Sequence, residues 1–244
     1  MGHVVAILVN AERTATKSFV RVFGLEKKEP RLKELLHSPR LAKAARDLED
    51  MAGGVRFYQA QAFFKEPGDG DSLWHSDNYA CPLDTNNQLT TAWIPMVKVE
   101  RQMGALAFAR GSHQDMSLSF WNDGKPMKKG DSLDEGAGVY NLHHITSRFH
   151  VDTWPRLNPG DVTFHAGWTM HASFSNTDEE SKVREAATVS YVPDSVRTLP
   201  TQNYAPLYAA DDYLNGIRQK LYAAKIAPGD SVPESILPRI WPTS

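Results

Sequence analysis

The residues of this sequence most suited to chemistry stand together in one short stretch, Trp74-His75-Ser76-Asp77. If the local backbone is extended, His75 and Asp77 point to the same side, because side chains alternate along a strand. One imidazole and one carboxylate supply two of the three ligands of the facial set that binds ferrous iron and leaves coordination positions open. Since His-x-Asp alone is common in solvated turns, the prediction of a metal site depends on a further histidine.

Two later histidines are candidates for the third ligand. His165 ends a predicted strand, and His171 follows a bend that contains Gly167. Arg184 comes thirteen residues after His171, directly before another predicted strand. We expect a hairpin through residues 175–180 to return Arg184 to the side of His171. A guanidinium at that point can bind a carboxylate through two parallel hydrogen bonds, which a lysine does less well.

A strand rich in aromatic residues is predicted over residues 55–65, where no glycine or proline interrupts the chain. Its alternation places Gln59, Gln61, Phe63 and Lys65 on one face. Buried glutamines and a buried lysine need polar partners. The strand is therefore either an edge strand with one wet face or the wall of a polar pocket.

Composition excludes several classes of protein. The chain has 244 residues, 41% of them hydrophobic and 23% charged, which is an ordinary globular mixture. A net charge of -2 gives no reason to expect a nucleic-acid partner. Cys81 is the only cysteine, so an internal disulfide and a cysteine-rich zinc site are excluded. No apolar run is long enough for a membrane span, and we expect a cytoplasmic protein, with import into an organelle left open.

The order of the predicted elements indicates a mainly β fold with flanking helices. Helices are predicted at residues 32–36, 39–48 and 211–221. Strands are predicted at residues 55–65, 89–99, 103–108, 151–154, 162–165 and 185–192. This order suits a jelly roll, the cupin-like double-stranded β-helix, whose mouth gathers ligands from different strands. We expect one domain over residues 1–244, with a lid-like polar insertion near residues 114–150.

In combination, these features resemble the phytanoyl-CoA dioxygenase family of Fe(II)- and 2-oxoglutarate-dependent oxygenases. The resemblance covers roughly residues 55–192, whereas residues 1–30 match the family pattern poorly. The motifs that carry it are, in chain order, Tyr58 to Gly68, Trp74-His75-Ser76-Asp77, Thr91-Ala92-Trp93-Ile94-Pro95, Gly104 to His113, and Pro159 to Ser173. Each motif is loose, but their order and spacing together are specific.

The resemblance implies a role for seven residues. His75, Asp77 and His171 would bind iron, which leaves His165 a structural role near the metal. Arg184 would bind the distal carboxylate of 2-oxoglutarate. Thr91, Gln61 and Lys65 align with positions that contact 2-oxoglutarate or line its pocket.

The implied reaction is hydroxylation of an unactivated carbon of a small molecule by O2, with release of succinate and CO2 and with ascorbate as a supporting reductant. Asp77 favours hydroxylation over halogenation, because related halogenases have a small residue at that position. Two alternatives stay open: a cupin-type hydrolase or isomerase with another divalent metal, and a non-catalytic binding protein on the same fold. Neither the substrate nor the oligomeric state follows from the sequence.

Overall fold

The computed structural model describes residues 19–115, 142–180, 182–199, 217, 220–221 and 223–242. Most of the predicted insertion, residues 116–141, lies outside the described residues. Of the helix predicted over residues 211–221, Ile217 and Leu221 are described as helical, and both are buried. The predictions of a single domain and of a lid stay predictions.

The larger of two antiparallel sheets has the strand order β1-β2-β11-β4-β9, with β13 also paired to β2. The bounds are Val20–Phe23 for β1, Val55–Lys65 for β2, Thr90–Pro95 for β4, Thr163–Ala166 for β9, Arg184–Pro193 for β11 and Arg239–Trp241 for β13. Because β2 pairs with β1 on one side and with β11 on the other, it is not an edge strand.

The smaller sheet has the order β10-β6-β7. Its strands are β6 (Leu106–Ala109), β7 (Val151–Thr153) and β10 (His171–Ser173), and a bridge between His75 and His171 adds the His75 segment at the edge. Two short pairs complete the β-structure: β3 (Leu83–Asp84) with β12 (Arg197–Thr198), and β5 (Val99–Glu100) with β8 (Arg156–Leu157). The strand predicted over residues 89–99 therefore divides into β4 and β5.

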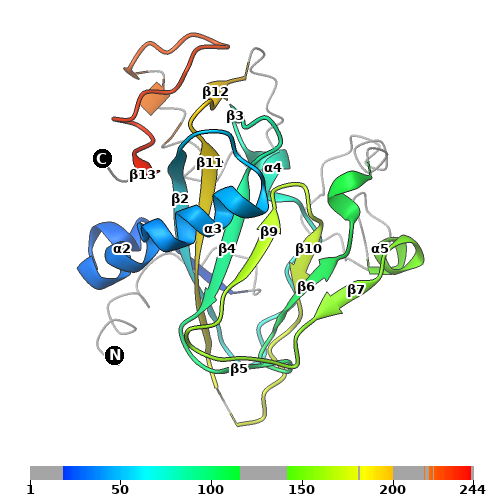
Figure 1. Cartoon of the computed structure of the whole chain (residues 1–244). Coiled ribbons are helices and arrows are strands. Elements are labelled where there is room, and N and C mark those ends of the chain that lie inside the picture. The colour runs from blue at the N-terminus through cyan, green and yellow to red at the C-terminus, as the bar shows by residue number, and fades with distance from the viewer. Residues whose placement is uncertain are drawn as a thin grey trace.

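Two helices pack on the outer face of the larger sheet. They are α2 (Pro30–Leu36) and α3 (Pro39–Leu48), and Figure 1 shows α3 crossing in front of that sheet, with α2 beside it. Each has a proline in its first turn, where the missing N–H removes no helical hydrogen bond. Further helical segments among the described residues are η1 (Leu25–Lys27), α4 (Asp77–Ala80), η2 (Ser112–Gln114) and α5 (Leu142–Arg148). The two helices and the sheet enclose the largest apolar core, which includes Leu36, Ala45, Ala92, Ile94, Val189 and Tyr191.

The inner face of the larger sheet is polar, because strand register puts the alternate residues there. Lys65 lies opposite Arg184, and Gln61 lies opposite Thr188. Thr91 lies opposite Ser190 on one side and opposite His165 on the other. These are the side chains that face the smaller sheet, since the His165 and His171 rings of the two sheets are 4.3 Å apart.

Two antiparallel sheets that face each other with helices outside confirm the predicted jelly roll. The predicted hairpin between His171 and Arg184 is wrong. β10 pairs with β6 in the smaller sheet, whereas β11 pairs with β2 and β4 in the larger one. The connecting loop crosses between sheets, and Asn176 holds it by donating hydrogen bonds to the carbonyls of Lys65 and Lys182, both at 2.9 Å.

Candidate metal centre

Backbone pairing brings His75 and His171 together. Each donates its backbone N–H to the other's carbonyl, at 3.0 and 2.9 Å, so the two imidazole rings lie side by side with centroids 4.2 Å apart. Ser76 is extended, and Asp77 begins the short helix α4. This stretch forms no strand beyond the isolated bridge at His75, but the one extended residue Ser76 is enough to turn Asp77 to the same side as His75.

The two imidazoles are oriented by backbone carbonyls. The Nδ1 of His75 lies 2.7 Å from the Leu73 carbonyl, and the Nδ1 of His171 lies 3.0 Å from the Thr169 carbonyl. Since a carbonyl only accepts, each Nδ1 carries the proton, and each Nε2 presents its lone pair to a metal. Both Nε2 atoms face Oδ1 of Asp77, at 3.9 Å from His75 and 3.8 Å from His171.

The second carboxylate oxygen of Asp77 points away from the two imidazoles. Thr91 donates its hydroxyl to Oδ2 at 2.7 Å, and His165 donates Nε2–H to the same atom at 3.2 Å. Burial alone would raise the pKa of Asp77, but the surrounding imidazoles of His171 and His165 outweigh it, so the pKa lies well below its usual range. Burial lowers the pKa of His171. The result is an ionised carboxylate beside a neutral imidazole, which is the state that a metal requires.

Among the residues that the structure describes, His75, Asp77 and His171 form a group able to hold a metal ion, with ligand atoms within 4.8 Å of one another. His165 stands outside this group and supports the carboxylate. Thr91 was predicted to contact 2-oxoglutarate, but its single proton goes to Asp77, and it accepts from Ser190 at 2.9 Å. Sequence reasoning missed Ser190, because its position opposite Thr91 depends on the strand register, which the sequence does not give.

A pair of buried cations lies on the same inner face. Lys65 is fully buried, and Arg184 directly opposite is 2% exposed. The Arg184 guanidinium lies over the Trp93 ring, with 5.7 Å from Cζ to the ring centroid, and its buried Nε has no hydrogen-bond partner. Among the described residues, none places a carboxylate within ion-pair distance of either cation.

Burial is the main cause of the altered pKa values of these cations. Burial and the neighbouring Arg184 lower the pKa of Lys65 to about 7, although Asp71 and Asp69 act in the opposite direction. Burial lowers the pKa of Arg184 to about 10, so the guanidinium stays charged at neutral pH. An uncompensated buried charge is costly unless a partner neutralises it, and an anionic ligand is the natural partner.

Lys65 connects the cation pair to the metal centre. Its ammonium group donates to Ser173 Oγ at 2.9 Å and to the Phe174 carbonyl at 2.6 Å. Ser173 is two residues from His171 on β10, which is roughly 7 Å along a strand. That separation is comparable with the length of a five-carbon dicarboxylate. Ser173 was missed by the sequence reasoning, although alternation from His171 would have placed it on the inner face.

Two further features mark this part of the inner face. Gln61 lies on the inner face as predicted, and its buried Oε1 has no hydrogen-bond partner. Gly104 adjoins Lys65, because a Cβ at that position would lie 2.6 Å from Lys65 Cδ and 2.6 Å from the Phe174 carbonyl. Gly104 also has a φ of 80°, which favours glycine. The space for the Lys65 side chain therefore depends on this glycine.

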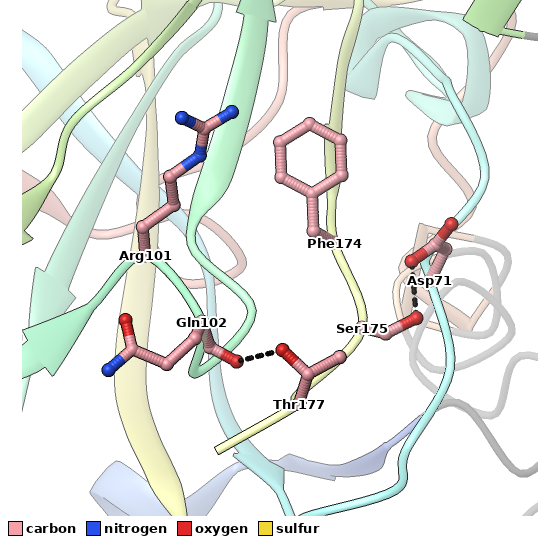
Figure 2. Close-up of a pocket in the computed structure, with 6 residues that line it drawn as sticks. All are labelled: Asp71, Arg101, Gln102, Phe174, Ser175 and Thr177. Atoms are coloured by element: carbon pink, nitrogen blue, oxygen red, sulfur yellow. Dashed lines mark hydrogen bonds between the residues drawn. The ribbon is translucent and has the colours of Figure 1, made fainter. Parts of the chain in front are cut away.

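Figure 2 shows a separate cavity of about 410 Å³, lined by residues that include Arg101 and Phe174. Phe174 lines it, and the Phe174 carbonyl accepts from Lys65. On its walls, Ser175 donates to Asp71 at 2.6 Å, and Thr177 donates to the Gln102 carbonyl at 3.4 Å. None of the predicted site residues lines this cavity.

Cys81 is buried, with its pKa raised to about 12 by burial, in line with its predicted lack of nucleophilic character.

The fold has relatives among solved structures. The epimerase SnoN from nogalamycin biosynthesis, an α-ketoglutarate-dependent non-haem enzyme, has a TM-score of 0.66 at 18% identity, over 98% of this chain and 86% of that one. The carbocyclase SnoK from the same biosynthesis gives 0.65 at 21% identity, over 91% and 76%. EctD from S. alaskensis, solved with 2-oxoglutarate and 5-hydroxyectoine, gives 0.58 at 18% identity, over 81% and 67%.

The family model of phytanoyl-CoA dioxygenase matches residues 8–184. The chain belongs to this family, whose members are Fe(II)- and 2-oxoglutarate-dependent oxygenases. The match begins well before residue 55, so the expectation that the family pattern is confined to residues 55–192 is wrong. This N-terminal part left little sign in the sequence because β1 has only four residues, all paired with β2, and so short a strand shows no clear alternation.

Proposed function

We propose that this chain is a dioxygenase that hydroxylates an unactivated carbon of a small molecule, with 2-oxoglutarate converted to succinate and CO2. His75, Asp77 and His171 would hold Fe(II). Their donor set of two neutral imidazoles and one carboxylate is the facial set that suits ferrous iron. When bound, iron and 2-oxoglutarate supply the oxidising chemistry, and the protein supplies placement and protection from water.

The single observation that carries the proposal is Arg184, a buried guanidinium without a carboxylate partner among the described residues. A distal carboxylate of 2-oxoglutarate would supply the missing charge through two parallel hydrogen bonds. Lys65 would add a second cation beside it. Ser173, which contacts Lys65 and lies near His171, stands where the ligand would pass from the cations to the metal.

The remaining groups orient the side chains that would bind the metal. Thr91 and His165 hold Oδ2 of Asp77, so that Oδ1 is the oxygen directed at the metal. The carbonyls of Leu73 and Thr169 keep both imidazoles in the binding tautomer. Trp93 covers the guanidinium and excludes water from it. These residues orient the metal-binding side chains and exclude water from the site. A rigid scaffold contributes to catalysis in this way.

The proposal also specifies the type of oxidation, namely hydroxylation. Asp77 would occupy a coordination position that a halogenase leaves to a halide, which supports oxygen transfer. SnoN and SnoK are named as an epimerase and a carbocyclase, so similar folds support more than one outcome. Product analysis decides between them, because hydroxylation adds one oxygen atom to the substrate and epimerisation or ring closure does not.

The experiment that tests the proposal is an anaerobic titration of the Fe(II)-loaded protein with 2-oxoglutarate. We expect the visible metal-to-ligand charge-transfer absorption, and succinate once O2 and a substrate are admitted. Arg184→Gln should bind Fe(II) as the wild type does but bind 2-oxoglutarate at least about 30-fold more weakly, because a buried charge pair is lost.

A matched control is Arg31→Gln, which removes an arginine whose side chain is 84% exposed on α2. This variant should titrate like the wild type. If Fe(II) binds but 2-oxoglutarate produces no charge-transfer absorption, the proposal fails, and the hydrolase, isomerase and binding-protein alternatives return.

Several expectations about the cellular setting stay predictions, namely a cytoplasmic location, the absence of a nucleic-acid partner and the support of activity by ascorbate. No helix in the described part of the chain has the length and apolar character to cross a membrane.

A further inference from the structure

The inner face of the smaller sheet carries aromatic side chains that the proposed chemistry does not use. Phe108 on β6 is the direct strand partner of His171 on β10, so both side chains point into the barrel. The Phe108 ring centroid lies 6.2 Å from that of His171 and 5.3 Å from that of His165. Phe108 therefore lies directly beside the metal ligand His171 and its neighbour His165.

Trp154 connects Phe108 to the surface. Asp152 on β7 pairs with Phe108, and alternation puts Trp154, two residues later, on the same side. The Trp154 and Phe108 rings meet edge to face, with centroids 5.6 Å apart and an interplanar angle of 78°. The indole is still 43% exposed, which makes it one of three exposed large hydrophobic side chains among the described residues. An exposed aromatic side chain in contact with a buried one beside a metal centre is a candidate ligand contact.

The charged groups beside these two rings are already paired. Arg110 binds Asp152 through two hydrogen bonds of 2.8 Å, and His150 lies 3.4 Å from the same carboxylate. Figure 1 shows β7 as the outer strand of the smaller sheet, so Trp154 lies near an edge of the barrel. Among the described residues, the charged groups of this cluster are therefore paired with one another, whereas an apolar ring finds the exposed indole of Trp154, which contacts the buried Phe108.

We propose that Trp154 and Phe108 select a substrate that carries a flat, uncharged ring system and stack it beside the metal centre. This inference rests on the proposed function, since it assigns the substrate class of the same site. Trp154 contacts the outer part of the ring system, and Phe108 contacts the part nearest to His171. Small zwitterions are disfavoured, because they offer no surface for these rings.

The test uses 2-naphthol and its fully saturated analogue, decahydro-2-naphthol, which share a carbon skeleton but differ in planarity. Binding is measured by anaerobic equilibrium dialysis against the protein loaded with Fe(II) and 2-oxoglutarate. We expect the wild type to bind the flat probe more tightly than the saturated one. Trp154→Ala should weaken 2-naphthol binding about tenfold, and Trp154→Phe should stay within about threefold of the wild type.

The control is Leu48→Ala, which removes another exposed hydrophobic side chain on α3, a helix packed against the outer face of the larger sheet. It should bind 2-naphthol as the wild type does. The charge-transfer absorption, recorded first for every variant, separates the two proposals: its absence refutes the proposed function. If the absorption is present, three results would overturn the substrate assignment alone. They are equal binding of 2-naphthol to the wild type and to Trp154→Ala, no preference of the wild type for the flat probe, and no measurable binding of either probe.

Discussion

The buried amine of Lys65 should make the affinity for 2-oxoglutarate depend on pH. Burial and the neighbouring Arg184 lower its pKa to about 7, so at pH 8 the ligand-free protein holds mostly the neutral amine. A dicarboxylate bound beside Lys65 favours the ammonium form and raises that pKa. Binding therefore takes up a proton above pH 7, and the affinity falls as the pH rises.

The magnitude follows from the pKa. With a ligand-free pKa of about 7 and a higher value in the complex, the apparent Kd rises about tenfold for each pH unit above 7, until the pKa of the complex is reached. Arg184 stays protonated over this range, because its pKa is about 10. The amine is half protonated at pH 7, so between pH 7 and pH 9 the Kd should increase by up to about 50-fold.

The assay is the anaerobic charge-transfer titration with 2-oxoglutarate, repeated between pH 6.5 and pH 9. Lys65→Met should bind weakly at every pH and show no such slope. Lys43→Met, which changes an exposed lysine on α3, should keep the wild-type slope. A Kd for the wild type that is equal at pH 7 and pH 9 would refute the reasoning, as would a full slope in Lys65→Met.

Three further predictions concern the metal centre and the space around Lys65. Thr91→Val removes one of two donors to Oδ2 of Asp77 and should weaken Fe(II) binding by about 10- to 100-fold in a chelator competition; unchanged affinity would contradict its supporting role. Gly104→Ala forces a Cβ against Lys65 and should reduce 2-oxoglutarate affinity, whereas Gly53→Ala, with φ of 91° and no atom within 4 Å, carries the same backbone strain without the crowding and should not. Asp77→Ala should abolish hydroxylation, and turnover like that of the wild type would exclude Asp77 from the metal site.

Short-range patterns identified much of this site from the sequence. Alternation along residues 55–65 put Gln61 and Lys65 on one face, and the structure shows that face lining the barrel. The spacing of His75 and Asp77 was enough, because only Ser76 had to be extended. These inferences succeeded because each depends on the local backbone alone.

Long-range geometry was beyond the sequence. The pairing of Arg184 with Lys65 depends on the register of β11 against β2, and the crossing from β10 to β11 depends on which sheet each strand joins. The bond from His165 to Asp77 joins residues 88 positions apart. The contact between Phe108 and Trp154 likewise needs β6 and β7 to be neighbours, which neither segment encodes by itself.

If 2-oxoglutarate binds at the two buried cations as proposed, its supply also affects the lifetime of the protein. Without a counter-ion, Lys65 and Arg184 oppose folding, and a bound dicarboxylate reverses this effect. A ligand at 100 times its Kd stabilises the folded state by about 2.7 kcal/mol. When 2-oxoglutarate is scarce, the chain would then open more often and be exposed to proteases. Susceptibility to proteolysis should therefore follow the cosubstrate concentration, and the amount of enzyme would fall along with its activity.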